Sequence, residues 1–179
     1  MKFTETELPG AFVIDAEPIE DERGHFARTW APSEFERRGL DPTLAQCNLA
    51  WNKTRGTLRG MHFQREPFAE VKIIQCTRGA LLDVIIDLRP DSSFFCRWTA
   101  VELSADRPRM LYVPKGFAHG YLTLADDVQA YYHVSMPYSA EHASGVAWND
   151  PAFGIRWPFS PTVMSAKDRS WQVFDPTRV

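Results

Sequence analysis

The densest group of residues suited to acid–base chemistry is the segment 59–64, which carries His62 and is followed by Lys72. An imidazole titrates near neutral pH and can take a proton from carbon, while an ammonium can stabilise the negative charge left on a neighbouring oxygen. If both side chains project into one cavity, they place a base beside a cation. Each also has a plainer interpretation, because a strand histidine is commonly structural and a lysine at a strand end is commonly solvated.

His119 is a second candidate, in the segment 114–120, where small neighbours predict a turn-like setting and an accessible ring. The alternative is a histidine that only caps a turn. Transition-metal sites are typically built from several histidines, and His62 is followed by Phe63 and Gln64 instead of a second histidine. We therefore expect no catalytic metal.

Tyrosines and two isolated charges complete the candidates. Successive strand residues face opposite sides of a sheet, so one of Tyr131 and Tyr132 should face a cavity, where its hydroxyl could donate a proton. A buried tyrosine bonded to the backbone is the alternative. By their own neighbours, Asp168 reads as a surface charge at a short helical turn and Arg23 as a solvated loop residue.

The elements that must position these side chains are short β-rich runs separated by Gly, Pro, Asn and Asp, from residue 45 to residue 148. The clearest predicted strands cover residues 71–76, 81–88, 98–103, 109–113 and 128–134. One helix is predicted over residues 32–38, with a proline in its first turn and Gly39 at its end. Sheets of this kind protect their edges by closing, and closed barrels can enclose ligand cavities. The pattern is typical of an all-β fold, and a cupin-type double-sheet jelly-roll barrel with a few short helices is one recurrent solution for such a chain.

Length and composition limit the class of protein. The 179 residues predict a single domain over residues 1–179, and 44% apolar with 24% charged residues is ordinary for a soluble globular chain. The first ten residues carry charges and a proline, and no later apolar run is long enough to span a bilayer, so we expect neither a signal peptide nor a membrane partner. A formal charge of −3 and the lack of a nucleic-acid motif predict no nucleic-acid partner.

The three cysteines predict the compartment. Cys47, Cys76 and Cys96 are an odd set without CxxC spacing, which argues against both a zinc site and a secreted disulfide framework. Reduced thiols in the cytoplasm are the expectation.

Taken together and in order, these residues resemble the dTDP-4-dehydrorhamnose 3,5-epimerase family, cupin-fold enzymes of deoxysugar biosynthesis. The similarity covers nearly the whole chain, and six motifs in register make it specific. The motifs are Asp21-Glu22-Arg23-Gly24-His25-Phe26, Leu58-Arg59-Gly60-Met61-His62-Phe63-Gln64, Lys72, Val113-Pro114-Lys115-Gly116-Phe117-Ala118-His119-Gly120, Trp148-Asn149-Asp150-Pro151 and Ser165-Ala166-Lys167-Asp168.

The resemblance implies a metal-independent epimerase that needs no cofactor and inverts C3 and C5 of a nucleotide-linked 4-keto-6-deoxy sugar through an enolate. It implies His62 as the base, Asp168 as its orienting partner, Lys72 beside the ketone oxygen, and Tyr132 as the acid. It also implies a homodimer whose nucleotide sites draw on both chains. The positions that match substrate-contacting residues are Arg23, Phe26, Gln46, Asn48, Arg59, His119 and Tyr138.

Three departures from the family pattern keep other functions open. His133 stands where a lysine follows the acid tyrosine, Arg28 replaces a glutamate, and Pro137-Tyr138 replaces a tyrosine pair. A C3-only epimerase or keto isomerase on a different nucleotide sugar, a noncatalytic sugar-nucleotide binding protein, and a metal-dependent cupin such as a dioxygenase or isomerase are the alternatives.

Overall fold

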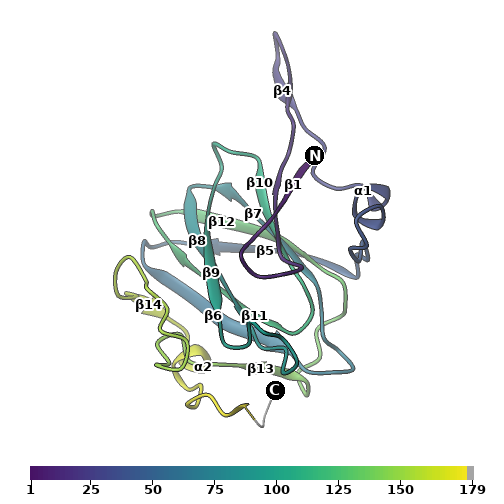
Figure 1. Cartoon of the computed structure of the whole chain (residues 1–179). Coiled ribbons are helices and arrows are strands. Elements are labelled where there is room, and N and C mark those ends of the chain that lie inside the picture. The colour runs from purple at the N-terminus through teal and green to yellow at the C-terminus, as the bar shows by residue number, and fades with distance from the viewer. Residues whose placement is uncertain (177–179) are drawn as a thin grey trace.

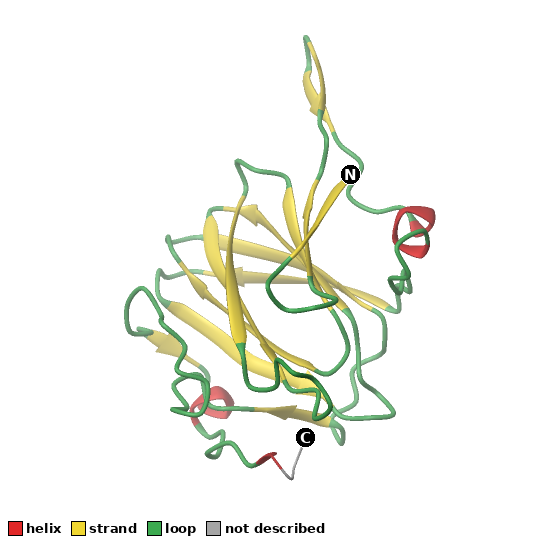
Figure 2. Ribbon diagram, viewed as in Figure 1, coloured by secondary structure: helices red, strands yellow, loops and turns green. Residues whose placement is uncertain are grey.

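The computed structural model describes residues 1–176, which form two packed β-sheets and a projecting hairpin (Figures 1 and 2). In order across it, the first sheet contains β1 (Lys2–Glu5), β2 (Phe12–Asp15), β10 (Arg109–Val113), β7 (Lys72–Arg78), β12 (Val128–Val134) and β5 (Gln46–Asn52). The second contains β13 (Ala143–Gly145), β6 (Thr57–Gln64), β11 (Phe117–Thr123), β8 (Ala80–Asp87) and β9 (Trp98–Ser104).

Five short elements lie outside these two antiparallel ladders. β14 (Val163–Met164) pairs in parallel with β6, and it leads into helix α2 (Ala166–Arg169). β3 (Ile19–Asp21) and β4 (Gly24–Phe26) form the hairpin that extends away from the body of the molecule. Helix α1 (Pro32–Glu36) begins with the expected proline and is followed by Gly39 at φ +69°.

The prediction of an all-β, double-sheet fold with short helices is confirmed. β10 and β12 have the predicted bounds, and β7, β8 and β9 differ from prediction by one or two residues at an end. The prediction of a turn-like setting around His119 is wrong, because the residue lies in the middle of β11, all seven residues of which are buried.

The main hydrophobic core lies between the two sheets. Ile74, Leu111 and Ala130 of the first sheet pack in one buried cluster with Ile85 and Leu103 of the second. Each fully buried Ile or Leu side chain stabilises the fold by about 1.5–3 kcal/mol. The core therefore holds the two sheets as fixed walls for the space that remains between them.

Two glycines bring β6 and β11 unusually close. A Cβ on Gly60, which has φ +153°, would lie 2.7 Å from Gly120 Cα, and a Cβ on Gly120 would lie 2.8 Å from the carbonyl oxygen of Arg59. The strand register shifts at this contact, after the pair His119–His62. The glycines thus set how the two histidines lie side by side on one sheet.

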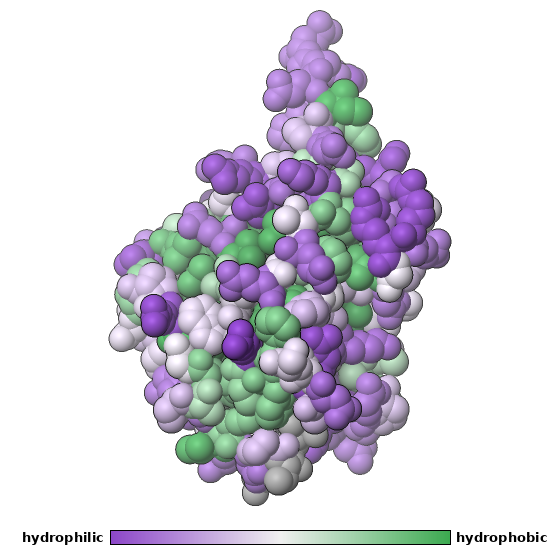
Figure 3. Space-filling model, viewed as in Figure 1, coloured by the Kyte–Doolittle hydropathy of each residue, from purple (hydrophilic) through white to green (hydrophobic). Residues whose placement is uncertain are grey.

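Two further observations concern membrane-spanning helices and exposed apolar side chains. Within residues 1–176, no helix is long and apolar enough to cross a bilayer. The tip of the β3–β4 hairpin is mostly hydrophilic, with apolar residues near its base (Figure 3). Ile19 and Phe26 are the large apolar side chains that this hairpin exposes.

Candidate active site

A cavity of about 660 Å³ lies between the two sheets, beside the main core. Strands β5, β7 and β12 supply one wall, and β6, β11 and β13 supply the other. β14 and α2 cover one side of it. A cavity of this size can hold a small ligand, so the polar side chains that line it are candidates for chemistry.

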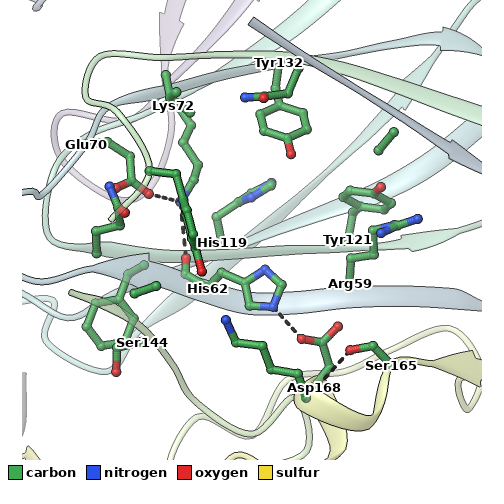
Figure 4. A pocket seen from close by; sticks show the side chains of 18 of the residues that line it. Arg59, His62, Glu70, Lys72, His119, Tyr121, Tyr132, Ser144, Ser165 and Asp168 are labelled. Atoms are coloured by element: carbon green, nitrogen blue, oxygen red, sulfur yellow. Dashed lines mark hydrogen bonds and ion pairs between the residues drawn. The ribbon is translucent and has the colours of Figure 1, made fainter. Parts of the chain in front are cut away.

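His62 on β6 and Asp168 on α2 form a close polar contact in the cavity, with His62 Nε2 2.5 Å from Asp168 Oδ1 (Figure 4). A carboxylate can only accept, so Nε2 carries the proton and Nδ1 is left as the unprotonated nitrogen of the neutral ring. The His62 side chain remains 40% exposed while Asp168 is buried. A base that faces the cavity is thus held by a carboxylate behind it.

Helix α2 presents Asp168 in its ionised form. Burial raises the pKa of Asp168, but the hydrogen bond and charge of His62, the Ser165 side chain and the Gly60 backbone outweigh burial and hold it below its ordinary value. Ser165 is also the N-cap of α2, where its hydroxyl accepts from the Asp168 backbone N–H at 3.0 Å. The reading of Asp168 as a surface charge from its neighbours alone is therefore wrong, whereas the role implied by the resemblance agrees with its position.

Lys72, the first residue of β7, reaches the same cavity from the opposite sheet. Its Nζ lies 2.5 Å from Glu70 Oε1 and 3.4 Å from the carbonyl oxygen of His62. The ammonium is therefore close to the strand that carries the base. Glu70 was not among the residues expected from sequence, and nothing in its local pattern distinguishes it from a surface glutamate.

Tyr132 is the tyrosine of β12 that faces the cavity, and Tyr131 is not among the lining residues. Burial raises the pKa of Tyr132, and the nearby positive charge of Arg59 only partly offsets this, so the phenol stays protonated near neutral pH. Tyr132 and His62 lie on opposite walls of the cavity (Figure 4). The cavity thus has an imidazole on one wall and a protonated phenol on the other.

Four more expected residues line the cavity: Gln46, Asn48, Arg59 and Tyr138. Arg59 Nε donates to Asn52 Oδ1 at 2.8 Å, which fixes an exposed guanidinium along the cavity wall. Gln46 Oε1 accepts from the Tyr138 backbone N–H at 2.6 Å, which ties the start of β5 to the segment after β12. These groups offer a cation and amide groups suited to an anionic, polar ligand.

His119 lines the cavity floor but is not freely accessible. Its Nε2 lies 2.5 Å from Asp83 Oδ1 on β8, and its side chain is 10% exposed. The prediction of an accessible ring is therefore wrong. His119 belongs to the cavity lining, as the resemblance implied, but its side chain is mostly buried and paired with Asp83. Asp83 was missed because it looks like one polar residue in an apolar strand.

Arg23 and Phe26 do not lie in this cavity. Both are on the β3–β4 hairpin, where the Arg23 side chain is 84% exposed and pairs with Asp21. Phe26 is likewise exposed. Two of the expected substrate-contacting residues are thus absent from the lining of the site that this chain forms by itself.

The departures from the family pattern also lie away from the cavity lining. His133 follows Tyr132 on β12 and so faces the other side of the sheet, and Arg28 is exposed. Pro137 precedes Tyr138 and donates no backbone hydrogen bond, while its carbonyl accepts from Gln64 at 3.2 Å. Among residues 1–176, no three His, Cys, Asp or Glu side chains are grouped as metal ligands would be.

The fold is a cupin-type jelly roll whose cavity is lined by a His–Asp pair, a lysine and a tyrosine. The family model for dTDP-4-dehydrorhamnose 3,5-epimerase matches residues 5–175, so this chain belongs to that family. A dTDP-4-dehydrorhamnose 3,5-epimerase from Sinorhizobium fredii is 43% identical over 171 residues, which is 95% of this chain and 88% of that protein.

Solved structures give the same result. A crystal structure of dTDP-4-dehydrorhamnose 3,5-epimerase from Bacillus anthracis with TDP and PPi bound has a TM-score of 0.93 at 41% identity, covering 97% of this chain and 99% of that one. A 3'-monoepimerase from Streptomyces bikiniensis in complex with dTDP-quinovose has a TM-score of 0.87 at 32% identity, covering 94% and 85%.

Proposed function

We propose that this protein inverts C3 and C5 of a dTDP-linked 4-keto-6-deoxy sugar, and that the cavity between the sheets is its active site. The observation that carries the proposal is the placement of His62 and Tyr132 on opposite walls, with Lys72 between the sheets as a cation. Inversion requires a proton to leave one face of a carbon and another to arrive on the opposite face. A base and an acid on facing walls meet that requirement.

The proposed first step is proton abstraction by His62 Nδ1 from the carbon beside the ketone. The electron pair of the C–H bond forms the C=C bond of the enolate, and the ketone π electrons move to oxygen. Lys72 stabilises the resulting negative oxygen, and Asp168 stabilises the imidazolium. Because Nε2 is bonded to Asp168 at 2.5 Å, Nδ1 is the nitrogen available for this step.

In the second step Tyr132 donates its proton to the opposite face of the same carbon, and the ketone re-forms. His62 has then gained a proton and Tyr132 has lost one, so both exchange with solvent before C5 is processed in the same way. The raised pKa of Tyr132 keeps the phenol protonated at neutral pH, ready to donate.

Arg59, Gln46, Asn48, His119 and Tyr138 are proposed to hold the nucleotide diphosphate and the sugar. We further propose a homodimer in which Arg23 and Phe26 of each chain complete the partner's site, because the projecting hairpin keeps both away from their own cavity. The three free thiols, Cys47, Cys76 and Cys96, support a cytoplasmic location.

Solvent deuterium labelling tests the reaction. The protein is incubated with dTDP-4-keto-6-deoxyglucose in D₂O, and the product is examined by NMR. We expect deuterium at both C3 and C5, whereas label at C3 alone would identify a C3-only epimerase. The structural similarity to the S. bikiniensis 3'-monoepimerase is the observation that keeps this alternative open, at a lower TM-score than that of the B. anthracis 3,5-epimerase. No label at either carbon would contradict both.

Hybrid dimers test the shared site. The Arg23→Ala variant and the His62→Ala variant should each have strongly reduced activity when assayed alone. If Arg23 serves the partner, mixing and re-forming dimers creates sites with an intact His62 from one chain and an intact Arg23 from the other, and activity returns. If Arg23 serves its own chain, every hybrid site carries one defect and activity stays low.

A further inference from the structure

Glu70 is the one acidic side chain in the cavity lining, besides Asp168, and the proposed reaction does not use it. Its side chain is 6% exposed and pairs with Lys72, which is 11% exposed. No donor among the described residues reaches Glu70 Oε2, which is fully buried. A buried carboxylate oxygen without a hydrogen bond destabilises a fold, so its presence calls for a reason.

Electrostatics alone make this placement unfavourable for the reaction. A negative charge 2.5 Å from the Lys72 ammonium partly cancels the field that would stabilise a developing enolate. If Lys72 acted only through its charge, a neutral residue at position 70 would serve better. A gain in geometry would offset this electrostatic cost.

The geometry of the ammonium supplies that gain. An ammonium has three N–H donors in fixed tetrahedral directions. One is directed at Glu70 Oε1 at 2.5 Å and a second at the His62 carbonyl oxygen at 3.4 Å. With two donors anchored, the third has a defined direction, and Lys72 lines the cavity in which the ketone would sit. Figure 4 shows both anchors beside Lys72.

We propose that Glu70 is a positioning residue that fixes the third N–H of Lys72 toward the ketone oxygen of the substrate. This inference rests on the proposed function. It assigns Glu70 no direct contact with the sugar, because Glu70 Oε2 is buried and Oε1 is occupied by Lys72. Glu70 acts through Lys72 alone, and a lysine without this anchor samples several rotamers of its long side chain.

Substitution of Glu70 should therefore reduce the rate of proton transfer more than it reduces substrate binding. Glu70→Ala removes the anchor and should lower kcat by about 100-fold, because a misdirected catalytic group costs on that order. Glu70→Gln keeps an oxygen acceptor at the same distance and should lower kcat by about 10-fold or less, a partial rescue. KM and the affinity for dTDP should change little, since the contact matters mainly in the transition state.

Glu141→Gln, the same change at an exposed glutamate, is the matched control and should leave kcat and KM unchanged.

A double-variant cycle separates positioning from a general structural role. If Glu70 acts through Lys72, then Glu70→Gln should slow deuterium wash-in when Lys72 is present and have no further effect in Lys72→Met. Losses that multiply in the double variant would overturn the inference, as would an unchanged kcat in Glu70→Ala. Lys72→Met leaves Glu70 unpaired, so the double variant, in which both groups are neutral, should have the higher melting temperature of the two.

The outcomes are distinguishable from failure of the proposed function. If the unmodified protein shows no wash-in at C3 or C5, the proposed function fails. If the unmodified protein is active and Lys72→Met is slow, but both Glu70 variants match Glu141→Gln, only the role of Glu70 is wrong.

Discussion

Two His–Asp pairs of the same geometry lie next to each other in this molecule. His62 and His119 are register partners on β6 and β11, and each places Nε2 2.5 Å from an aspartate Oδ1. They differ in access: His62 is 40% exposed and His119 10%. The pairing that could activate a histidine is thus present twice, and the His62 ring is much the more exposed of the two.

The aspartates explain the difference. Asp83 comes from the centre of β8, so its histidine is fixed within the sheet. Asp168 comes from the short helix α2, which covers the edge of the cavity and approaches His62 from behind. A carboxylate on a separate element can orient a histidine without enclosing it. The comparison supports the proposal that His62 abstracts the proton, while His119, held in the sheet, lines the cavity and contacts the substrate.

The largest expected effect is that of replacing the exposed ring. His62→Ala should slow deuterium wash-in by roughly 100-fold to 10,000-fold, the usual range for loss of one general base. His119→Ala should slow it much less, and should act mainly on KM and stability. Equal losses in kcat for the two variants would show that the rings share the proton transfer and would end the distinction.

Asp168→Asn should come next. The amide no longer demands a donor from Nε2, so the ring can rotate or change tautomer, and the imidazolium loses its counter-charge. We expect wash-in to fall by about 100-fold, within the range seen when an orienting partner is removed. Dissociation constants for dTDP, measured by calorimetry, should stay close to those of the unmodified protein. A variant as active as the unmodified protein would exclude the orienting role.

Asp83→Asn sharpens the comparison from the other side. The variant leaves His119 without its carboxylate in a buried setting, so the free energy of unfolding should fall by about 1–3 kcal/mol. Wash-in at saturating substrate should fall far less than in Asp168→Asn. Chemical denaturation and NMR exchange on the same samples give both values. A stable but inactive Asp83→Asn would move this pair into the reaction.

The smallest effect is the pH dependence of stability that Asp168 contributes. Burial raises its pKa, but His62, Ser165 and Gly60 lower it further, so the folded value lies below the ordinary 3.8. The stabilisation is therefore complete above the unfolded pKa and is lost as pH falls through the folded pKa. The difference in unfolding free energy between the unmodified protein and Asp168→Asn should shrink as the pH falls below about 4, the ordinary pKa of an aspartate. A difference that grows on acidification would contradict this sign.

Strands with clear alternation or continuous apolar runs, such as β10 and β12, could be predicted from the sequence. β11 was not recognised, because Gly120 and the neighbouring Pro-Lys-Gly turn look like loop, and its glycine is required by the approach of β6 at Gly60. Local pattern also cannot pair residues that are distant in the chain. Asp168 was located at the base only through the family resemblance.

Other parts of the site had no signal in the sequence. Asp83 and Glu70 are single polar residues beside apolar runs, and only the folded sheets bring them to His119 and Lys72. Arg23 and Phe26 were expected at the substrate, and the hairpin carries them away from their own cavity. In the proposed homodimer these two residues belong to the partner's site, so a single folded chain does not show their contacts with the substrate.

Tyr132→Phe in D₂O tests most directly whether base and acid act from opposite walls. Without the phenol, His62 can still remove a proton and return deuterium to the same face. We therefore predict that label enters C3 while its configuration is retained, and that His62→Ala admits no label at an appreciable rate. Continued inversion in Tyr132→Phe, or rapid wash-in without His62, would contradict the account.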